Sequence, residues 1–159
     1  MSLPITGVLC NKFIEQFLNL FCSTFDGVYS CDNIPNHLVN KKTFQIVVNL
    51  SKQDNQGSHF ISILKENNQV FYLESFALPL LNDDISDFII KNNVQVKKLK
   101  HQIQSLSSSF CGFYCILFCL LKDNIMKTSK LPFLFVHEDH LQENDKLCLS
   151  YILKCIEKK

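Results

Sequence analysis

Apolar residues recur at helical spacing near the start of the chain and at strand-like spacing in its middle. Over residues 8–25 the aromatic and aliphatic side chains fall three or four positions apart, which predicts an amphipathic helix that ends at Asp26-Gly27. Residues 28–40 hold several turn-forming residues and no periodic pattern. We expect that segment to be irregular and to line one edge of a cleft.

Three runs rich in β-branched and aromatic residues follow, at 43–50, 59–64 and 69–76. Polar turn residues separate them, and Glu66-Asn67-Asn68 predicts the turn of a hairpin that joins the last two runs. These runs are typical of central antiparallel strands. Residues 94–103 alternate well enough to predict one further strand.

Three later segments have the pattern of helices. Residues 82–92 follow a capping residue, Asn82 or Asp83, and predict a surface helix. Residues 110–121 form an unbroken apolar run, which is typical of a buried helix, and residues 144–157 are amphipathic. The pattern predicts an α+β fold in which a buried helix packs on a central antiparallel sheet.

The composition fits one globular domain over residues 1–159, with 47% hydrophobic and 19% charged residues and no linker. A net charge of +1 does not favour a nucleic-acid partner, and the basic cluster around Lys97 and Lys98 is more typical of a solvated strand face. The longest apolar run is shorter than the roughly 20 residues that span a bilayer. Because no secretory signal is recognisable, we expect a soluble intracellular protein with eight reduced cysteines.

Four residues have the types and order that a cysteine hydrolase needs. Cys111 opens the buried helix, where the helix dipole and a neighbouring imidazolium favour a thiolate. His59 can carry the proton, and Glu74 can orient the imidazole because hairpin pairing brings the two strand ends together. Gln104, seven residues before Cys111, can donate to the developing oxyanion, and Gly112 would let a substrate backbone approach.

Other assignments remain open at these positions. Asp83 or Asp84 would replace Glu74 if the hairpin register slipped, and Gln102 points the same way along its strand as Gln104. Cys115 and Cys119 are more typical of core thiols than of nucleophiles or metal ligands. No cofactor or metal is expected, and we interpret His137 and His140 as the start of a solvated helix rather than a zinc site.

The order His, acid, Gln, Cys-Gly resembles the adenovirus-type cysteine proteases (adenain), and more distantly the proteases of SUMO-like modifiers. The matching motifs are Phe25-Asp26-Gly27, Asn49 ten residues before the histidine, Gly57-Ser58-His59-Phe60, Tyr72-Leu73-Glu74-Ser75-Phe76 and Cys111-Gly112-Phe113-Tyr114-Cys115. The aromatic after the histidine is usually Trp and is Phe60 here.

The resemblance implies a papain-like fold with catalytic His59, Glu74, Gln104 and Cys111. Substrate-contacting positions would be Gly57, Ser58, Phe60 and Gly112. It also implies an activating peptide held by a disulfide and a DNA cofactor. Neither is well supported, because the region near Asn93 has no cysteine and the net charge is only +1.

The function that the resemblance implies is processing of capsid or core precursors, near Gly-containing sites, for a DNA virus or a Maverick/Polinton transposon. Such an enzyme would act in the host nucleus or cytoplasm, or be packaged in virions, with no membrane partner. One alternative is an isopeptidase that removes a ubiquitin-like or SUMO-like modifier. The other is a non-catalytic binding module, which the complete set of site residues disfavours.

Overall fold

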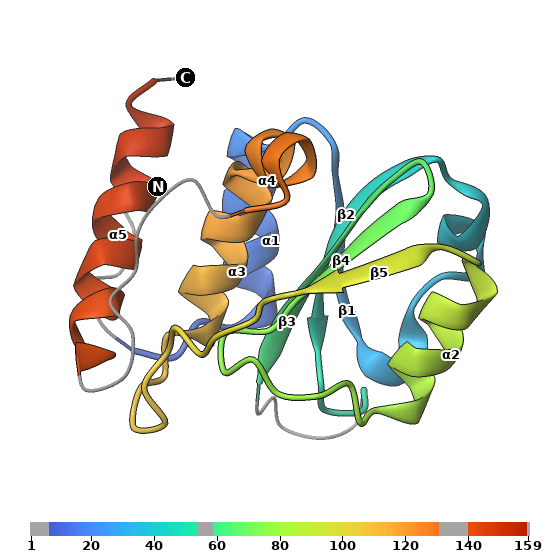
Figure 1. Cartoon of the computed structure of the whole chain (residues 1–159). Helices are drawn as coiled ribbons and strands as arrows, with labels where there is room; N and C mark the ends of the chain where they lie inside the picture. The colour runs from blue at the N-terminus through green and yellow to red at the C-terminus, as the bar shows by residue number, and fades with distance from the viewer. Residues whose placement is uncertain (1–6, 54–58, 131–139, 159) are drawn as a thin grey trace.

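The structure is a computed structural model that describes residues 7–53, 59–130 and 140–158. It contains a five-stranded sheet in the order β1-β2-β3-β4-β5, with helices on both faces (Figure 1). The elements are α1 (Asn11–Phe21), β1 (Phe25–Ser30), η1 (Cys31–Asn33), η2 (Asn36–Asn40), β2 (Thr43–Asn49), β3 (Phe60–Glu66), β4 (Gln69–Leu73), α2 (Asp83–Lys91), β5 (Gln95–Lys98), α3 (Cys111–Leu120), α4 (Lys122–Thr128) and α5 (Glu143–Ile156).

The sheet is antiparallel at its centre and parallel at both edges. β2, β3 and β4 pair antiparallel, as the sequence predicts, while β1 pairs parallel with β2 and β5 pairs parallel with β4. The α+β class with an antiparallel centre and a buried helix is confirmed. The parallel edges were not foreseen, because the hydrophobic pattern gives no strand direction.

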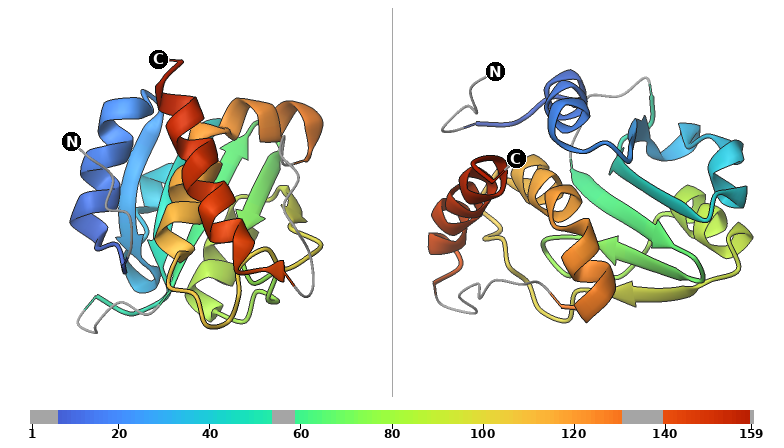
Figure 2. Two further views of the ribbon diagram at one scale, coloured as in Figure 1. Left: turned by 90° about the vertical axis from the view of Figure 1, so that its left-hand side faces the viewer. Right: turned by 90° about the horizontal axis from the view of Figure 1, so that it is seen from above.

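Alternation along β3 divides the core into two clusters. Phe60 and Leu64 belong to the cluster that holds α1, α3 and α5, whereas Ile61 and Ile63 belong to the cluster under α2. Nine of the ten residues of α3 are buried, so this helix is covered on all sides. Figure 1 and the right-hand view of Figure 2 show α3 between α5 and the sheet. The nucleophile candidate therefore starts a helix that cannot move independently of the core.

Strand β1 occupies the junction between the long helix and the irregular segment that the sequence predicts, while the rest of that segment forms the short turns η1 and η2. α1 ends at Phe21, and the chain then runs as a strand through Asp26 and Gly27, residues that normally signal a turn. Gly27 has φ 141°, and the pairing with β2 shifts register between Phe25 and Gly27. A strand with a bulge, a glycine and little alternation of burial has no recognisable strand pattern.

The hairpin β3–β4 has the turn that the sequence predicts. Glu66 pairs with Gln69, so Asn67 and Asn68 form the loop, and Asn67 has the left-handed φ of 51°. Because asparagine tolerates this conformation better than most residues, the turn fixes the register of the two strands. β5 is shorter than predicted, since pairing stops at Lys98, before the polar residues Lys100 and His101.

Within the described residues, no helix is long and apolar enough to cross a membrane. None of the eight cysteines, all of which lie in the described residues, forms a disulfide.

We expect Asn67→Val to lower the free energy of unfolding by about 1–2 kcal/mol, because a β-branched residue is strained in the left-handed region. Asn67→Gly should be at least as stable as the unaltered protein. Asn68→Val, at the loop position without positive φ, is the matched control. Urea unfolding of the three variants measures the effect, and equal stability of the two Val variants would contradict this account of the turn.

Candidate active site

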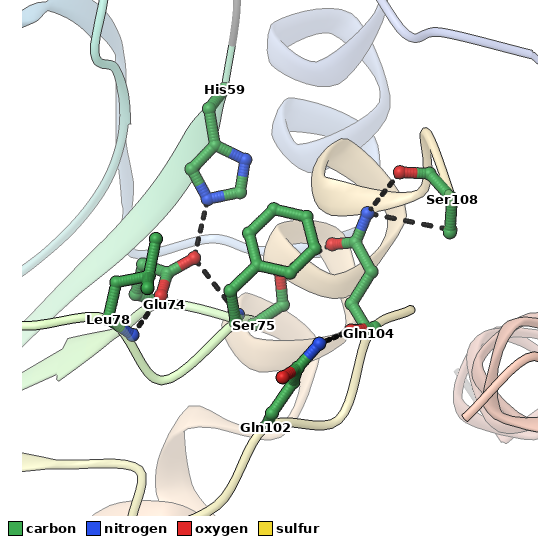
Figure 3. Close-up of polar contacts among 8 residues, drawn as sticks. His59, Glu74, Ser75, Leu78, Gln102, Gln104 and Ser108 are labelled. Atoms are coloured by element: carbon green, nitrogen blue, oxygen red, sulfur yellow. Dashed lines mark hydrogen bonds and ion pairs between the residues drawn. The ribbon is translucent and has the colours of Figure 1, made fainter. Parts of the chain in front are cut away.

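His59 and Glu74 meet at one end of the hairpin. His59 directly precedes β3 and Glu74 directly follows β4, and the register places both at the same end of the sheet. The ring Nε2 lies 2.6 Å from Oε1 of Glu74 (Figure 3). His59 also stacks on Phe76, with 4.9 Å between the ring centroids. The pairing excludes the register slip that would have brought Asp83 or Asp84 to the histidine.

The Glu74 carboxylate is buried and fully engaged. Only 2% of the residue is exposed, yet Oε1 also accepts from the backbone N–H of Phe76 at 3.0 Å and Oε2 from that of Leu78 at 2.6 Å. Burial alone would raise the pKa of Glu74. The hydrogen bonds from His59 and the two backbone N–H groups outweigh burial and lower that pKa below its ordinary value. Glu74 is therefore held as a carboxylate that can stabilise an imidazolium.

Cys111 contacts the same imidazole from the other layer of the fold. It is the first residue of α3 and is 7% exposed. Burial of the His59 ring opposes its protonation, but hydrogen bonds to Cys111 and Glu74 outweigh burial and raise the pKa of His59 to about 9. Since Nε2 binds Glu74, Nδ1 is the nitrogen left for the thiol. Cysteine, histidine and glutamate thus form one hydrogen-bonded series.

The other cysteines of α3 lie in a different environment. Cys115 and Cys119 are buried in the core, and burial raises the pKa of each well above its ordinary value. Thiols of this kind stay protonated at neutral pH and are poor nucleophiles. Among the cysteines of α3, only Cys111 touches a base.

Gln104 is completely buried beside this series, with both ends of its amide held. Oε1 accepts from the Ser75 hydroxyl at 2.5 Å, and Nε2 donates to the backbone carbonyl of Ser108 at 2.9 Å (Figure 3). A second contact of Nε2, to the Ser108 hydroxyl, is long at 3.5 Å. Gln102 instead folds back, and its Nε2 donates to the Gln104 carbonyl at 2.6 Å. Of the two glutamines, Gln104 is the one whose side-chain amide lies near the nucleophile helix.

The positions expected to contact substrate stay predictions. Gly57 and Ser58 lie outside the described residues. Phe60 is 4% exposed and lines the cavity at Cys111. Gly112 packs against α1 and the segment before it. A Cβ there would lie 3.0 Å from Cβ of Leu9, so the absence of a side chain at this glycine is explained by its approach to Leu9.

Two cavities adjoin the series. One of about 410 Å³ is lined by Cys111 and Phe60 together with Val8, Leu9, Cys10, Asn11, Lys12, Ser30, Asn49 and Gln53. The other, of about 330 Å³, is mainly apolar and is lined by Leu50, His59, Tyr72, Glu74, Leu78, Pro79, Leu81 and Asn82. Both volumes are in the range of side-chain and small-molecule sites. Cys111 and His59 therefore line separate cavities.

No metal site competes with this interpretation in the part of the chain that the structure describes, where no three His, Cys, Asp or Glu residues gather closely enough to hold an ion. His137 lies outside that part. Nδ1 of His140 lies 3.8 Å from Oε1 of Glu143, and both side chains are exposed.

No protein-family profile matches the sequence, and no curated protein is significantly similar to it. Solved structures do resemble it. ChlaDub1 from Chlamydia trachomatis aligns with a TM-score of 0.55 and 11% identity, over 98% of this chain and 93% of its own. AvrA, in the structure of its delL154 form with IP6 and CoA, aligns with a TM-score of 0.52 and 14% identity, over 92% of this chain and 68% of its own. The ASFV pS273R protease aligns with a TM-score of 0.51 and 14% identity, over 97% of this chain and 70% of its own.

The chain has the papain-like, adenain-like fold of cysteine proteases. At these identities the likeness is one of fold, and it extends over nearly the whole chain. The fold thus includes the C-terminal helix, α5, for which the sequence motifs gave no counterpart.

The pKa of His59 predicts how stability depends on pH. A folded-state pKa of about 9, raised from 6.5, means that protonation of His59 stabilises the protein fully below about pH 6.5. That contribution is lost as the pH rises through about 9. We expect the difference in free energy of unfolding between wild type and His59→Gln to shrink between pH 6.5 and 9.5, as measured by urea unfolding. A difference that stays constant over this range would contradict the assignment.

Proposed function

We propose that the protein is a cysteine endopeptidase that cleaves capsid or core precursor proteins of a DNA virus or virus-like transposon. The observation that carries the proposal is the hydrogen-bonded series Cys111, His59 and Glu74, with Cys111 lining a cavity. The fold shared with the ASFV pS273R protease supports protease chemistry. The choice of precursor substrate rests on the adenain-like motifs.

In the first half of the reaction, the Cys111 thiolate adds to the carbonyl carbon of the scissile peptide bond. The carbonyl electrons move to oxygen, which accepts from Gln104 and from backbone N–H groups near Cys111. His59, protonated at neutral pH, then gives its proton to the leaving nitrogen as the C–N bond breaks. The products are a free amine and a thioester on Cys111.

In the second half, neutral His59 takes a proton from water while the water oxygen attacks the thioester carbon. The C–S bond breaks, Cys111 leaves as a thiolate, and the imidazolium is restored beside Glu74. Glu74 keeps the ring oriented in both halves through its 2.6 Å contact. The series therefore returns to its starting charge state.

The surroundings of Cys111 favour a small residue next to the cut. With 7% of Cys111 exposed and Phe60 beside it, a bulky side chain at the scissile bond would clash before its carbonyl reached the sulfur. Glycine meets this constraint, in line with the Gly-containing sites that the resemblance implies. A modifier that ends in Gly-Gly meets it too, so an isopeptidase would use the same chemistry.

We expect Cys111→Ala to abolish cleavage of a Gly-rich precursor peptide, because the variant has no nucleophile. Cys155→Ala, which removes a half-buried thiol of α5, is the control and should keep wild-type activity. Each variant is assayed against a capsid-precursor peptide and against a modifier with a Gly-Gly extension, with and without DNA. Unchanged cleavage by Cys111→Ala would refute the proposal, and cleavage of the modifier alone would move it to the isopeptidase.

We expect Gln104→Ala to lower kcat by roughly 10²–10³, the usual cost of losing one oxyanion donor. KM should change little, because the ground-state carbonyl carries little charge. Gln102→Ala is the matched control, since its amide already donates to the Gln104 carbonyl. Steady-state kinetics measure kcat and KM of the two variants, with the enzyme concentration taken from titration of Cys111. A wild-type kcat for Gln104→Ala would assign the oxyanion to backbone donors alone.

A further inference from the structure

The segment that joins Gln104 to Cys111 is hydrogen-bonded to the first turn of the C-terminal helix, α5. Residues 103–110, which we name the nucleophile loop, run from Ile103 to the start of α3. The first turn of α5 reaches this loop at two points. Nδ2 of Asn144, a completely buried residue, donates to the Ile103 carbonyl at 2.8 Å, and Oδ2 of Asp145 accepts from the Ser108 hydroxyl at 2.7 Å.

Asp145 is itself fixed in place. Its second oxygen, Oδ1, accepts from the Tyr114 hydroxyl of α3 at 3.0 Å, so the carboxylate bridges the loop and the nucleophile helix. Burial raises the pKa of Asp145, while the hydrogen bonds from Ser108 and Tyr114 oppose that rise. Hydrogen bonds to an ionised acceptor are stronger than those between neutral groups. Both oxygens of Asp145 are thus engaged, one by the nucleophile loop and one by α3.

Ser108 transmits this bridge to Gln104. Because its hydroxyl hydrogen is given to Asp145, the oxygen is left to accept, and it does so from the backbone N–H of Phe110 at 3.2 Å. The carbonyl of Ser108 accepts from Nε2 of Gln104 at 2.9 Å (Figure 3). Moving Ser108 would therefore move the partner that sets the direction of the Gln104 amide.

The opposite end of the amide has a separate anchor. Ser75, next to Glu74, donates its hydroxyl to Oε1 of Gln104, and its carbonyl accepts from the backbone N–H groups of Ile103 and Gln104. The amide plane is consequently defined by one contact from the sheet side and one from the α5 side. Loss of either contact would leave the amide plane with a single anchor.

We propose that Asp145 is a positioning residue of the active site, which orients the Gln104 amide towards the oxyanion through Ser108, with Asn144 holding the start of the same loop. The inference rests on the proposed function and adds to it the role of the C-terminal helix. Oxyanion donors contribute most when they are preorganised, because they then need no rearrangement in the transition state. The C-terminal helix supplies that preorganisation.

The test compares Asp145→Ala and Asp145→Asn with two controls on α5. Glu143→Gln removes an exposed carboxylate of the same turn, and Ile152→Val disturbs completely buried packing further along the helix. For Asp145→Ala we expect kcat to fall roughly 10-fold, less than for loss of the donor itself. KM should stay within about twofold, since uniform binding is unchanged. Both controls should keep the wild-type kcat.

Two further readouts separate positioning from general damage. Alkylation of Cys111 by iodoacetamide, followed by peptide mass spectrometry, needs the thiolate but no oxyanion site, so its rate should be unchanged in Asp145→Ala. In a Gln104→Ala background, Asp145→Ala should cause little further loss of kcat, because both changes remove the same contribution.

The proposal is overturned if Asp145→Ala lowers kcat no more than Ile152→Val does, if alkylation slows in parallel with kcat, or if the two losses are fully additive. If Asp145→Ala does not fold, the same comparison is made with Asp145→Asn and Ser108→Ala.

Absence of any peptidase activity in the wild type would refute the proposed function instead. The anchoring of the loop is then judged by amide hydrogen exchange over residues 105–110, which should be faster in Asp145→Asn than in Glu143→Gln; equal rates would overturn it.

Discussion

The buried pair of His59 and Glu74 is the interaction on which the rest of the site depends. A carboxylate that is 2% exposed is costly unless it is fully hydrogen-bonded, and removing one partner of such a pair typically costs about 3–5 kcal/mol. The pair forms only in one register of the β3–β4 hairpin, and a shift by one residue would turn one of the two side chains to the opposite face. The turn at Asn67 and the backbone donors of Phe76 and Leu78 therefore help to form the candidate active site, although they lie outside the contact between His59 and Glu74.

The second requirement is that a separate layer of the molecule deliver the sulfur to this pair. α3 does so because it is apolar on all sides and is enclosed between the sheet and α5, while its first residue, Cys111, lines a cavity. Position along the helix, rather than residue type, distinguishes Cys111 from Cys115 and Cys119. The burial of α3 keeps the thiols of Cys115 and Cys119 protonated, and it also fixes the position of Cys111.

The sequence was informative where local patterns decide the structure. Turn residues and alternation predicted the hairpin, and with it the contact of His59 with Glu74, while the Asn82 cap and the apolar run predicted α2 and α3. It was uninformative where contacts join distant segments. β1 pairs parallel through a bulged, glycine-containing stretch, and the contact of Asp145 with Ser108 spans 37 residues with no local signal. The close approach of Gly112 to Leu9 is likewise a contact that only the tertiary structure could reveal.

The cavity at Cys111 contains a second thiol. Cys10, which is exposed and directly precedes α1, lines the same cavity as Cys111. A covalent ligand with two electrophilic groups would react with both sulfurs, and the second reaction would be favoured by the effective concentration that the first creates. Selectivity for this cavity would then come from Cys10, a residue outside the series of Cys111, His59 and Glu74.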